Sequence, residues 1–589
     1  MKIVLSTLNS KFIHSSLSIR YLKEYVREIA KVEIKEYTIN QNIDFIVSEL
    51  YRLNPDVIGF STYIWNVEEI IKVSKALKIV RPNMKIFLGG PEVSYDGMQS
   101  MRENPHIDFI LYGEGEETFR EFTEKLLEKS EEFSDVNGLI YKKGEEIIKN
   151  PPRALICELD KIPSPYEKIS NEFKNKIVYL ESSRGCPFGC KFCLSSTIRG
   201  VRYFSIERVK RDLDNLIDSG VRQVKFVDRT FNANKEYSMD IMNHIMDRDP
   251  KNMNFHFEVT AHLLDEEMLE FISHAKEGLF QFEIGVQSTN PLTIDAIGRT
   301  TDLERLKEVT KRIKSYKNIH QHLDLIAGLP YEDYSSFRDS FNDVFEIRPE
   351  KIQLGFLKLL KGSELRDDED KYGFKYLNSP PYEVLKTDYI NYMDVIKLKG
   401  VEDAVEKYYN EGYFEHTIEY IIANNYNNAF DFFEDLSEYW VSKKYHHVSN
   451  SRTKLYQILA DFYKDRELKD FNIFRELIRF DFIANNRSSK MPEIIKNKNI
   501  STNYIDVHAL LKDERVLNRY LSEYKNTPTK RIIKDVKVER FSVDVFKLIE
   551  DKYKYVEADS HADALFIYRK DSISGFSVFD IGYIAKELV

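Results

Sequence analysis

Three of the chain's four cysteines lie close together in the stretch "ESSRGCPFGCKFC" at residues 181–193, with the spacing Cys186-x₃-Cys190-x₂-Cys193. A structural zinc site uses four nitrogen or sulfur ligands, usually as two pairs far apart, and Cys157 alone offers no second pair. A disulfide framework is typical of small secreted chains, whereas this chain has 589 residues. Three thiolates on one loop suit three irons of a [4Fe–4S] cluster, whose fourth iron stays open for a non-protein ligand.

The pattern C-x₃-C-x-Φ-C, in which Φ is the aromatic Phe192, resembles the signature of radical S-adenosylmethionine (SAM) enzymes. The resemblance implies Cys186, Cys190 and Cys193 as metal ligands and Phe192 beside SAM, with no catalytic residue assigned beyond the cofactors. It implies that the open iron binds the amino and carboxylate groups of SAM, and that an added electron cleaves SAM to a 5′-deoxyadenosyl radical. An external electron donor such as flavodoxin or ferredoxin and a reducing, anaerobic setting are further expectations.

Composition limits the partners and the compartment. The chain has 86 Lys and Arg against 96 Asp and Glu, a formal net charge of −10, which weakens the case for a protein that follows nucleic-acid phosphates. The first residues, "MKIVLSTLNS", read as a strand rather than a signal peptide. No apolar run approaches the ~20 residues that span a bilayer. We expect a cytoplasmic protein with no membrane partner.

Residues 1–145 alternate short apolar runs with amphipathic helical stretches, which predicts a parallel, doubly wound, flavodoxin-like sheet. Ligands of such sheets bind outside the carboxyl ends of the strands. A hairpin, "VNGLIYKKGEEIIK", and a proline-rich linker at residues 146–169 follow. The expected strands are residues 2–7, 32–39, 55–62, 84–90 and 107–113, and the expected helices are residues 16–29, 43–53, 67–80 and 116–129.

The loops at those strand ends resemble the cobalamin-binding domain that precedes the radical module in one large subclass of the family. The resemblance is carried by "IGFSTYIWN", "LGGPE" and "GEGEET". Glycines let the backbone approach a ligand closely, and a helix N-terminus donates hydrogen bonds. Ordinary turns of a flavodoxin-like sheet are the alternative interpretation. The residues implied in cobalamin binding are His14, Ser61, Thr62, Gly89, Gly90, Pro91, Gly113, Glu114 and Gly115.

The first loop departs from one version of that domain. Cobalamin domains that ligate cobalt from below carry D-x-H-x-x-G after the first strand, whereas this loop reads "LNSKFIHSSLS". We therefore expect cobalamin without a protein imidazole on cobalt. His14 then serves as a polar loop residue near the corrin, and ligation of cobalt by His14 is the alternative.

Residues 170–366 repeat a strand and a helix about six times, which predicts a partial (β/α)₆ barrel with its chemistry at the carboxyl ends of the strands. Polar side chains gather there in "DRTFN", "EIGVQS", "AIGR" and "DLIAGLP". The expected strands are residues 176–182, 221–228, 254–261, 279–286, 319–328 and 350–359.

This segment resembles the branch that includes oxygen-independent coproporphyrinogen oxidase and the anaerobic magnesium-protoporphyrin cyclase. The resemblance implies that Gln287 and Asp324 hold the ribose hydroxyls of SAM and that Arg299 pairs with its carboxylate. Glu258 would orient Arg299 or the amino group, and Asp228 would also line the site. The residue types suit these tasks, because an arginine fork matches a carboxylate and carboxylate or amide oxygens match a diol.

Residues 367–589 carry no motif of known chemistry. Aromatic-rich amphipathic helices predict a mostly α-helical domain, with a small β tail near residues 537–584. The Tyr and Phe stripes are expected to form helix–helix core. One locally basic stretch, residues 525–540, reads as a solvated strand face.

The function that the resemblance implies is SAM cleavage with methyl transfer from methylcobalamin to a substrate carbon. Redox or rearrangement chemistry without methylation, as in the cyclase branch, is the alternative, because the cofactors rather than protein residues carry the difference. The acidic composition favours a small-molecule or peptide substrate. A radical SAM enzyme that acts on RNA is the second alternative.

Overall fold

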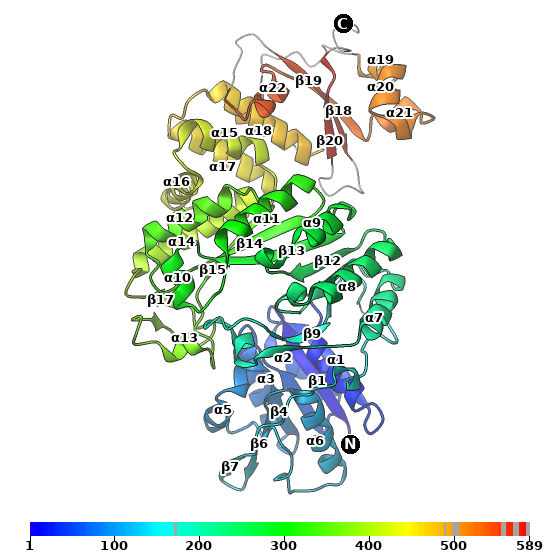
Figure 1. The fold of residues 1–589 in the computed structure, drawn as a ribbon, viewed down its shortest axis with the longest axis vertical. Helices are drawn as coiled ribbons and strands as arrows, with labels where there is room; N and C mark the ends of the chain where they lie inside the picture. Colours follow the sequence, from blue (N-terminus) through cyan, green and yellow to red (C-terminus); the bar gives the residue numbers. More distant parts are fainter. Residues whose placement is uncertain are drawn as a thin grey trace. The chain divides into compact units, whose positions relative to one another are not determined.

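A computed structural model describes residues 1–169, 173–487, 490–497, 506–554, 561–568, 576–582 and 584. The chain forms two compact units. Residues 1–334 with 355–391 make the first unit, and residues 335–354 with 392–589 make the second. Figure 1 shows the first unit mainly in blue, cyan and green.

The N-terminal part of the first unit is built on a seven-stranded sheet with the order β2-β1-β3-β4-β5-β6-β7. The first five strands are parallel, so the doubly wound sheet is confirmed. The expected hairpin is also present, with β6 antiparallel to β5 and to β7. The strands are β1 (Ile3–Asn9), β2 (Val32–Thr38), β3 (Val57–Ser61), β4 (Lys85–Gly89), β5 (Phe109–Leu111), β6 (Leu139–Lys143) and β7 (Glu146–Lys149).

Helices cover both faces of this sheet because consecutive strand side chains point to opposite sides. Val4 and Leu8 pack with the helices α2 (Ile43–Arg52) and α3 (Val67–Val80). Ile3 and Leu5 pack on the other face with α1 (Leu17–Tyr25) and α6 (Gly115–Leu127). Two apolar cores of this kind explain why the strands read as nearly continuous apolar runs.

The sheet extends past the boundary that the sequence analysis drew at residue 145. β7 (Glu146–Lys149) pairs with β6, and Ile148 packs against the α1–α6 core. The second arm of the hairpin therefore belongs to the sheet rather than to the linker.

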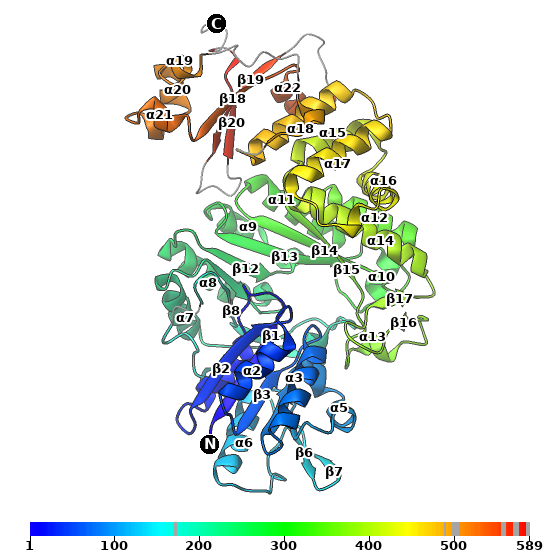
Figure 2. The ribbon, with the colours of Figure 1, turned by 180° about the vertical axis from the view of Figure 1, so that it is seen from behind.

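A six-stranded sheet with the order β15-β14-β13-β12-β11-β8 follows in the chain, as the repeat predicted. Most of it belongs to the first unit, whereas residues 335–354, which hold its last helix and most of its last strand, belong to the second. Neighbouring strands from β8 to β14 are parallel. Figure 2 shows β12, β13, β14 and β15 in green. The elements are β8 (Ile177–Leu180), α7 (Ile206–Asp218), β11 (Gln223–Phe226), α8 (Lys235–Arg248), β12 (Asn254–Glu258), α9 (Glu266–Ser273), β13 (Phe280–Gln287), α10 (Pro291–Ala296), α11 (Leu303–Tyr316), β14 (His320–Ala327), α12 (Tyr334–Phe345) and β15 (Lys351–Phe356).

A two-stranded hairpin carries the cysteine loop. β9 (Ser183–Cys186) pairs antiparallel with β10 (Gly200–Tyr203), so that Cys186 lies opposite Gly200 and Arg184 lies opposite Arg202. Gly185 has a φ of 101°, and a Cβ there would lie 2.1 Å from Gly200 O. Only glycine fits this close approach between the two strands.

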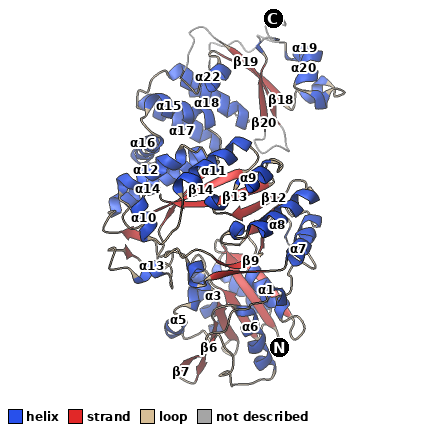
Figure 3. Ribbon diagram, viewed as in Figure 1, coloured by secondary structure: helices blue, strands red, loops and turns tan. Residues whose placement is uncertain are grey.

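The second unit is mostly helical, as Figure 3 shows in blue. Large aromatic side chains fill its core, including Tyr408, Tyr456 and Tyr463, and the ring of Tyr463 stacks on Phe474 at 3.9 Å between centroids. The expectation that the aromatic stripes form core is confirmed. The helices are α14 (Tyr392–Val405), a π-helical turn (Glu406–Asn410), α15 (Glu415–Asn425), α16 (Ala429–Ser442), α17 (Arg452–Asp465) and α18 (Phe471–Asn485).

The division between the units differs from the boundary expected after residue 366. Phe341 on α12 contacts Phe430 and Phe433 of α16, which joins the last barrel helix to the second unit. Conversely, Leu365 and Phe374 pack with Leu357 and Leu359 in the first unit. The apolar faces of these segments, rather than their order in the chain, decide the grouping.

The β tail is an antiparallel sheet with the order β18-β19-β20. Its strands are β18 (Val536–Phe541), β19 (Ala562–Tyr568) and β20 (Phe576–Asp580); residues 569–575, which the expected strands also included, lie outside the described part of the chain. None of the helices that could be searched in the described ranges is long and apolar enough to cross a bilayer.

Candidate functional site

The cysteine loop is held at both ends. On one side it continues from β9, and on the other Lys191 N donates to Ile297 O at 2.9 Å while Leu365 N donates to Lys191 O at 2.9 Å. Phe192 is partly buried against the apolar cluster that contains Ile297 and Leu329. The aromatic residue of the motif therefore anchors the loop to the barrel.

The three thiols of this loop are free and lie near one another. Burial raises the pKa of Cys190, which is 7% exposed, and the Cys193 and Cys186 thiols raise it further. The nearby guanidinium of Arg299 acts in the opposite direction, with Nη1 3.7 Å from Cys190 Sγ. In the described residues, no three His, Cys, Asp or Glu side chains are grouped as ligands of one metal ion. Cluster ligands each bind a different iron.

Arg299 lies between the cysteine loop and the end of β13. Its Nη2 donates to Gly285 O and its Nε donates to Thr301 Oγ1 at 3.0 Å. Two oxygen acceptors, Gly285 O and Thr301 Oγ1, hold the guanidinium beside Cys190, where an arginine fork suits the carboxylate of a ligand on the cluster.

Gln287 ends β13 in a conformation that few residues adopt. Its φ is 72°, and the pairing of β13 with β14 shifts between Gly285 and Gln287. Its Oε1 is buried without a hydrogen-bond partner. A Cβ on Gly285 would lie 2.2 Å from Gln287 Nε2, so this glycine makes room for the amide. Strained backbone with an unsatisfied buried acceptor is a feature of ligand sites.

Asp324 on β14 lies opposite Gly285 and has a buried Oδ1 without a partner. Burial raises its pKa well above the usual range, and the Glu283 and Glu258 carboxylates raise it further. Burial likewise raises the pKa of Glu258, whose nearest cation is Arg229 at 3.9 Å rather than Arg299. Carboxyl groups crowded in this way favour incoming hydrogen-bond donors.

Asp228 is fully occupied by its own surroundings. Its Oδ1 accepts from the Ser182 hydroxyl at 2.6 Å and the Ser183 hydroxyl at 2.5 Å, and its Oδ2 accepts from Ser182 N at 3.0 Å. The carboxylate thus ties β11 to the segment that leads into β9. Its role in contacting SAM stays a prediction.

The loops after β3 and β4 lie against each other at the carboxyl edge of the N-terminal sheet. Thr62 donates to Gly89 O from its amide at 2.7 Å and from its hydroxyl at 2.8 Å. Gly90 has a φ of 116°, and a Cβ there would lie 2.4 Å from Thr62 O. Pro91 then opens the short helix α4 (Pro91–Ser94). Ser61 Oγ lies 3.1 Å from Ser18 Oγ, at the same edge.

Two of the remaining residues expected near cobalamin, His14 and Glu114, contact residues outside the N-terminal sheet. His14 Nδ1 lies 2.7 Å from Tyr179 Oη on β8, and burial lowers the pKa of His14. Gly113 has a φ of 80°, and Gly115 is the first residue of α6. Glu114 accepts from Arg202 and from Ile156 N. Ligation of cofactors by these residues stays a prediction.

Sequence reasoning missed several polar residues beside the cysteine loop. His262 follows β12, its Nδ1 is buried without a partner, and its ring lies 6.1 Å from that of Phe188. Thr230 Oγ1 lies 3.6 Å from Cys186 Sγ. Both residues follow strand ends, so their position was the available signal. Thr230 stands in the stretch "DRTFN", whereas no quoted stretch contains His262.

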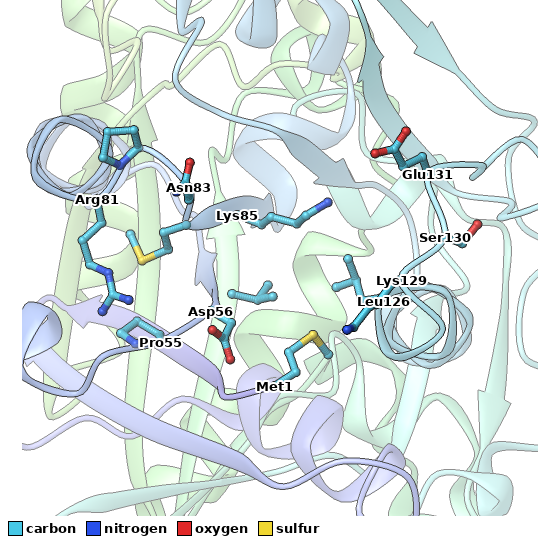
Figure 4. A pocket seen from close by; sticks show the side chains of 13 residues that line it. Met1, Pro55, Asp56, Arg81, Asn83, Lys85, Leu126, Lys129, Ser130 and Glu131 are labelled. Carbon is cyan, nitrogen blue, oxygen red and sulfur yellow. The ribbon is translucent and has the colours of Figure 1, made fainter.

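A surface cavity of about 480 Å³ lies at the opposite edge of the N-terminal sheet. Figure 4 shows Met1, Asp56, Arg81 and Lys85 around it. These residues lie before or at the start of strands, whereas parallel sheets bind ligands at the carboxyl ends. This cavity is separate from the cysteine loop and its neighbours.

Comparison with known families agrees with this arrangement. Residues 3–123 match the B12 binding domain and residues 180–344 match the radical SAM superfamily. The chain therefore contains a B12-binding domain followed by a radical SAM domain. Residues 370–561 match a protein family of unknown function, DUF4080.

Curated proteins that are similar to this chain include three with different names. An uncharacterized methyltransferase of Pyrococcus horikoshii is 29% identical over 326 residues, which cover 54% of this chain and 70% of that protein. The cobalamin-dependent radical SAM methyltransferase TokK of Streptomyces tokunonensis is 26% identical, and the match covers 55% of this chain and 50% of that protein. The anaerobic magnesium-protoporphyrin IX monomethyl ester cyclase of Cereibacter sphaeroides is 24% identical, and the match covers 56% of this chain and 57% of that protein. The match thus spans only about half of TokK and of the cyclase.

The fold is also similar to that of a solved radical SAM protein. The structure of OxsB with aqua-cobalamin bound gives a TM-score of 0.60 at 17% identity, covering 84% of this chain and 82% of that one. The similarity shows a shared fold.

Proposed function

We propose that this chain is a cobalamin-dependent radical SAM enzyme that transfers a methyl group to a substrate carbon. The observation that carries the proposal is the placement of three free thiols at the mouth of a radical SAM barrel, in the same compact unit as a B12-binding domain. When bound, the [4Fe–4S] cluster, SAM and cobalamin supply the radical and methyl chemistry.

The cysteine loop fits an iron–sulfur cluster. Burial raises the pKa of Cys190, so its thiolate needs a positive partner. A bound cluster would supply that positive partner, because a thiol that coordinates a metal is held as the thiolate. Arg299 adds a fixed positive charge 3.7 Å from Cys190 Sγ. Cys186, Cys190 and Cys193 are the proposed ligands.

The ends of β13 and β14 fit the nucleoside part of SAM. Gln287 Oε1 and Asp324 Oδ1 are buried acceptors without partners, and ribose hydroxyls are donors that would satisfy them. Arg299 would bind the carboxylate of SAM, and Glu258 would bind its amino group, because the Glu258 carboxylate is not paired with Arg299 here. Asp228 acts through the Ser182–Ser183 turn as a positioning residue.

The loops after β3, β4 and β5 fit a large flat ligand approached by backbone. Gly90 and Gly113 have positive φ values, and nothing lies within 4 Å of a Cβ built on Gly113. Thr62, Gly89, Pro91 and Gly115 would line the same edge, together with Ser61 and His14. A seven-stranded sheet with rigid cores holds these loops in place.

A small-molecule or peptide substrate fits better than RNA. In the basic stretch at residues 525–540, Arg540 pairs with the buried Asp563 at 2.8 Å and Lys537 pairs with Glu539 at 3.0 Å. These contacts reduce the positive field that nucleic-acid binding relies on. Reduction of the cluster requires an external donor such as flavodoxin or ferredoxin, and the reducing cytoplasm suits this chemistry.

Product analysis tests the proposed reaction. The reconstituted protein is incubated with SAM, a strong reductant and a small-molecule extract under anaerobic conditions. Methyl transfer predicts S-adenosylhomocysteine and 5′-deoxyadenosine in a ratio of about one to one, because one SAM supplies the methyl group and a second supplies the radical. 5′-Deoxyadenosine without S-adenosylhomocysteine would instead favour redox chemistry, which the similarity to the cyclase keeps as the second candidate.

A further inference from the structure

A buried cluster of charges joins the loop after β5 to the hairpin that carries the cysteine loop. Arg202 donates to both oxygens of Glu114, at 2.6 and 3.1 Å. Arg184 donates to Glu116 at 2.5 Å and to Glu181 at 3.0 Å, and its Nη1 lies 3.5 Å from Glu114. Two arginines of the hairpin therefore share the carboxylates that begin α6.

These side chains are withdrawn from solvent. The exposed fractions are 12% for Arg184, 18% for Arg202, 12% for Glu114 and 7% for Glu116. Burial alone would raise the pKa of Glu114, but hydrogen bonds from Arg202 and Ile156 N and the charge of Arg184 lower it. A buried ion cluster adds little net stability, but losing one partner leaves a buried charge unpaired. The arrangement is consequently stiff.

This group of charged side chains connects two loops. One is proposed to border the corrin, and the other is proposed to hold the [4Fe–4S] cluster. Glu114 stands between Gly113 and Gly115, in the loop proposed to border the corrin. Arg184 stands two residues before Cys186 and pairs across the hairpin with Arg202. A movement of either loop would have to carry the other with it.

A second contact ties the loop after β4 to the barrel in the same way. Glu92, which is 5% exposed on α4, accepts a hydrogen bond from Tyr382 and pairs with Lys361 at 3.2 Å. Carboxylates on two loops of the N-terminal sheet thus bind residues of the first unit outside that sheet.

We propose that Glu114, Glu116, Arg184 and Arg202 form a positioning latch that couples the corrin loop to the cluster loop. The inference rests on the proposed function. With the latch intact, filling the cluster site orders the hairpin and through it the corrin loop, so the cluster strengthens cobalamin binding. By thermodynamic reciprocity, cobalamin stabilises the cluster to the same extent. The latch residues touch neither cofactor in this role.

Titration with hydroxocobalamin tests the latch, followed by absorbance, on protein with the cluster and on the C186A/C190A/C193A variant without it. In protein with an intact latch, we expect the [4Fe–4S] cluster to tighten cobalamin binding by about fivefold or more. A fivefold effect lies at the lower end of typical coupling free energies. In Glu114→Gln this ratio should fall to near one. The electron paramagnetic resonance (EPR) line shape of the reduced cluster should respond to cobalamin in the wild type and not in Glu114→Gln.

The matched control is Glu167→Gln, which breaks an exposed pair between Arg27 and Glu167 at 3.0 Å that also bridges the N-terminal domain and the linker. It should keep the wild-type ratio. If Glu114→Gln does not fold, Arg202→Gln is tested in its place, because in that variant Glu114 still has Arg184 as an ion-pair partner. The ratio in question is the cobalamin affinity with the [4Fe–4S] cluster divided by the affinity without it. A wild-type value of this ratio in the folded latch variant, or a ratio near one in the wild type, would overturn the latch but not the proposal that the chain binds cobalamin. A wild type that binds no corrinoid would overturn the proposed function as well.

Discussion

The residues proposed to bind SAM store unfavourable free energy when no ligand is present. Gln287 has a left-handed backbone and an unsatisfied Oε1, and Asp324 has a buried carboxyl crowded by Glu283 and Glu258. Groups arranged in this way commonly stabilise a ligand at the expense of the free protein.

Asp324→Asn should therefore weaken SAM binding without destabilising the protein. The amide keeps the side-chain volume and removes the buried acid, while the loss of a charged acceptor should raise the dissociation constant about tenfold, or about 1.4 kcal/mol. Calorimetric titration with SAM and a thermal melt measure the two effects. Asp247→Asn, on the exposed face of α8, is the control that should change neither. Unchanged affinity together with a lower melting temperature would assign Asp324 a purely structural role.

His14 should not ligate cobalt. Its Nδ1 lies 2.7 Å from Tyr179 Oη, and its loop pairs with β8 through the bridge between His14 and Ile177. The EPR spectrum of the cob(II)alamin form should show no nitrogen splitting from a protein imidazole. His14→Ala should leave that spectrum unchanged, and a spectrum in which the splitting is present and disappears in His14→Ala would contradict this assignment.

Residue types at strand ends were predictable from sequence, and their partners were not. "EIGVQS" and "DLIAGLP" lie at the carboxyl ends of β13 and β14, so the barrel rule locates Gln287 and Asp324. The same rule also selects Asp228 as a SAM contact, although the oxygens of Asp228 already accept hydrogen bonds from Ser182 and Ser183. Which donors reach a carboxylate depends on packing between segments far apart in the chain.

At the scale of elements, the strands and helices follow the hydrophobic period closely. β7 is one exception to the expected boundaries, because the hairpin continues the sheet beyond the turn at Gly144. α12 is the other, because its Phe341 and Phe345 find their partners in the helices that follow the barrel. Periodicity identifies an apolar face, but it does not name the surface that the face packs on.

The junction of α15 and α18 provides a pH-dependent element. Asp481 on α18 is 2% exposed and accepts from Thr417 N at 2.8 Å and Thr417 Oγ1 at 2.6 Å. Burial raises its pKa to about 6. This effect is larger than that of His416 and of the hydrogen bonds from Thr417, which lower the pKa. Because the folded pKa exceeds the unfolded value of about 3.9, stability from this group is present at low pH and is lost as pH rises through 6.

Between pH 4.5 and 7 the free energy of unfolding of the second unit should therefore fall by about 2 kcal/mol more than in Asp481→Asn. The chain has two tryptophans, so in a Trp65→Phe background Trp440 alone reports on the second unit. Urea denaturation followed by its fluorescence measures the difference. Parallel pH profiles for the two proteins would show that Asp481 does not titrate in this range.

For the whole molecule, the order of domains was evident from sequence and the connections between them were not. The strand–helix repeats predict a doubly wound sheet followed by a partial barrel. The resemblance of the strand-end loops and of the cysteine motif implies that these are a B12-binding domain and a radical SAM domain. The latch at Glu114 and Arg202 depends on side chains 88 positions apart, and neither stands in a motif that predicts pairing. Residues 370–561, which include most of the second unit, match a family of unknown function.

The most direct test of the proposed site is the EPR spectrum of the reduced cluster before and after SAM is added, in anaerobic protein that holds cobalamin. We expect about four irons per chain and a change in the g values with SAM, because its amino and carboxylate groups bind the open iron. C186A/C190A/C193A should give no cluster signal. About eight irons per chain, tetrahedral zinc in place of iron, or a cluster spectrum that SAM leaves unchanged would contradict the site.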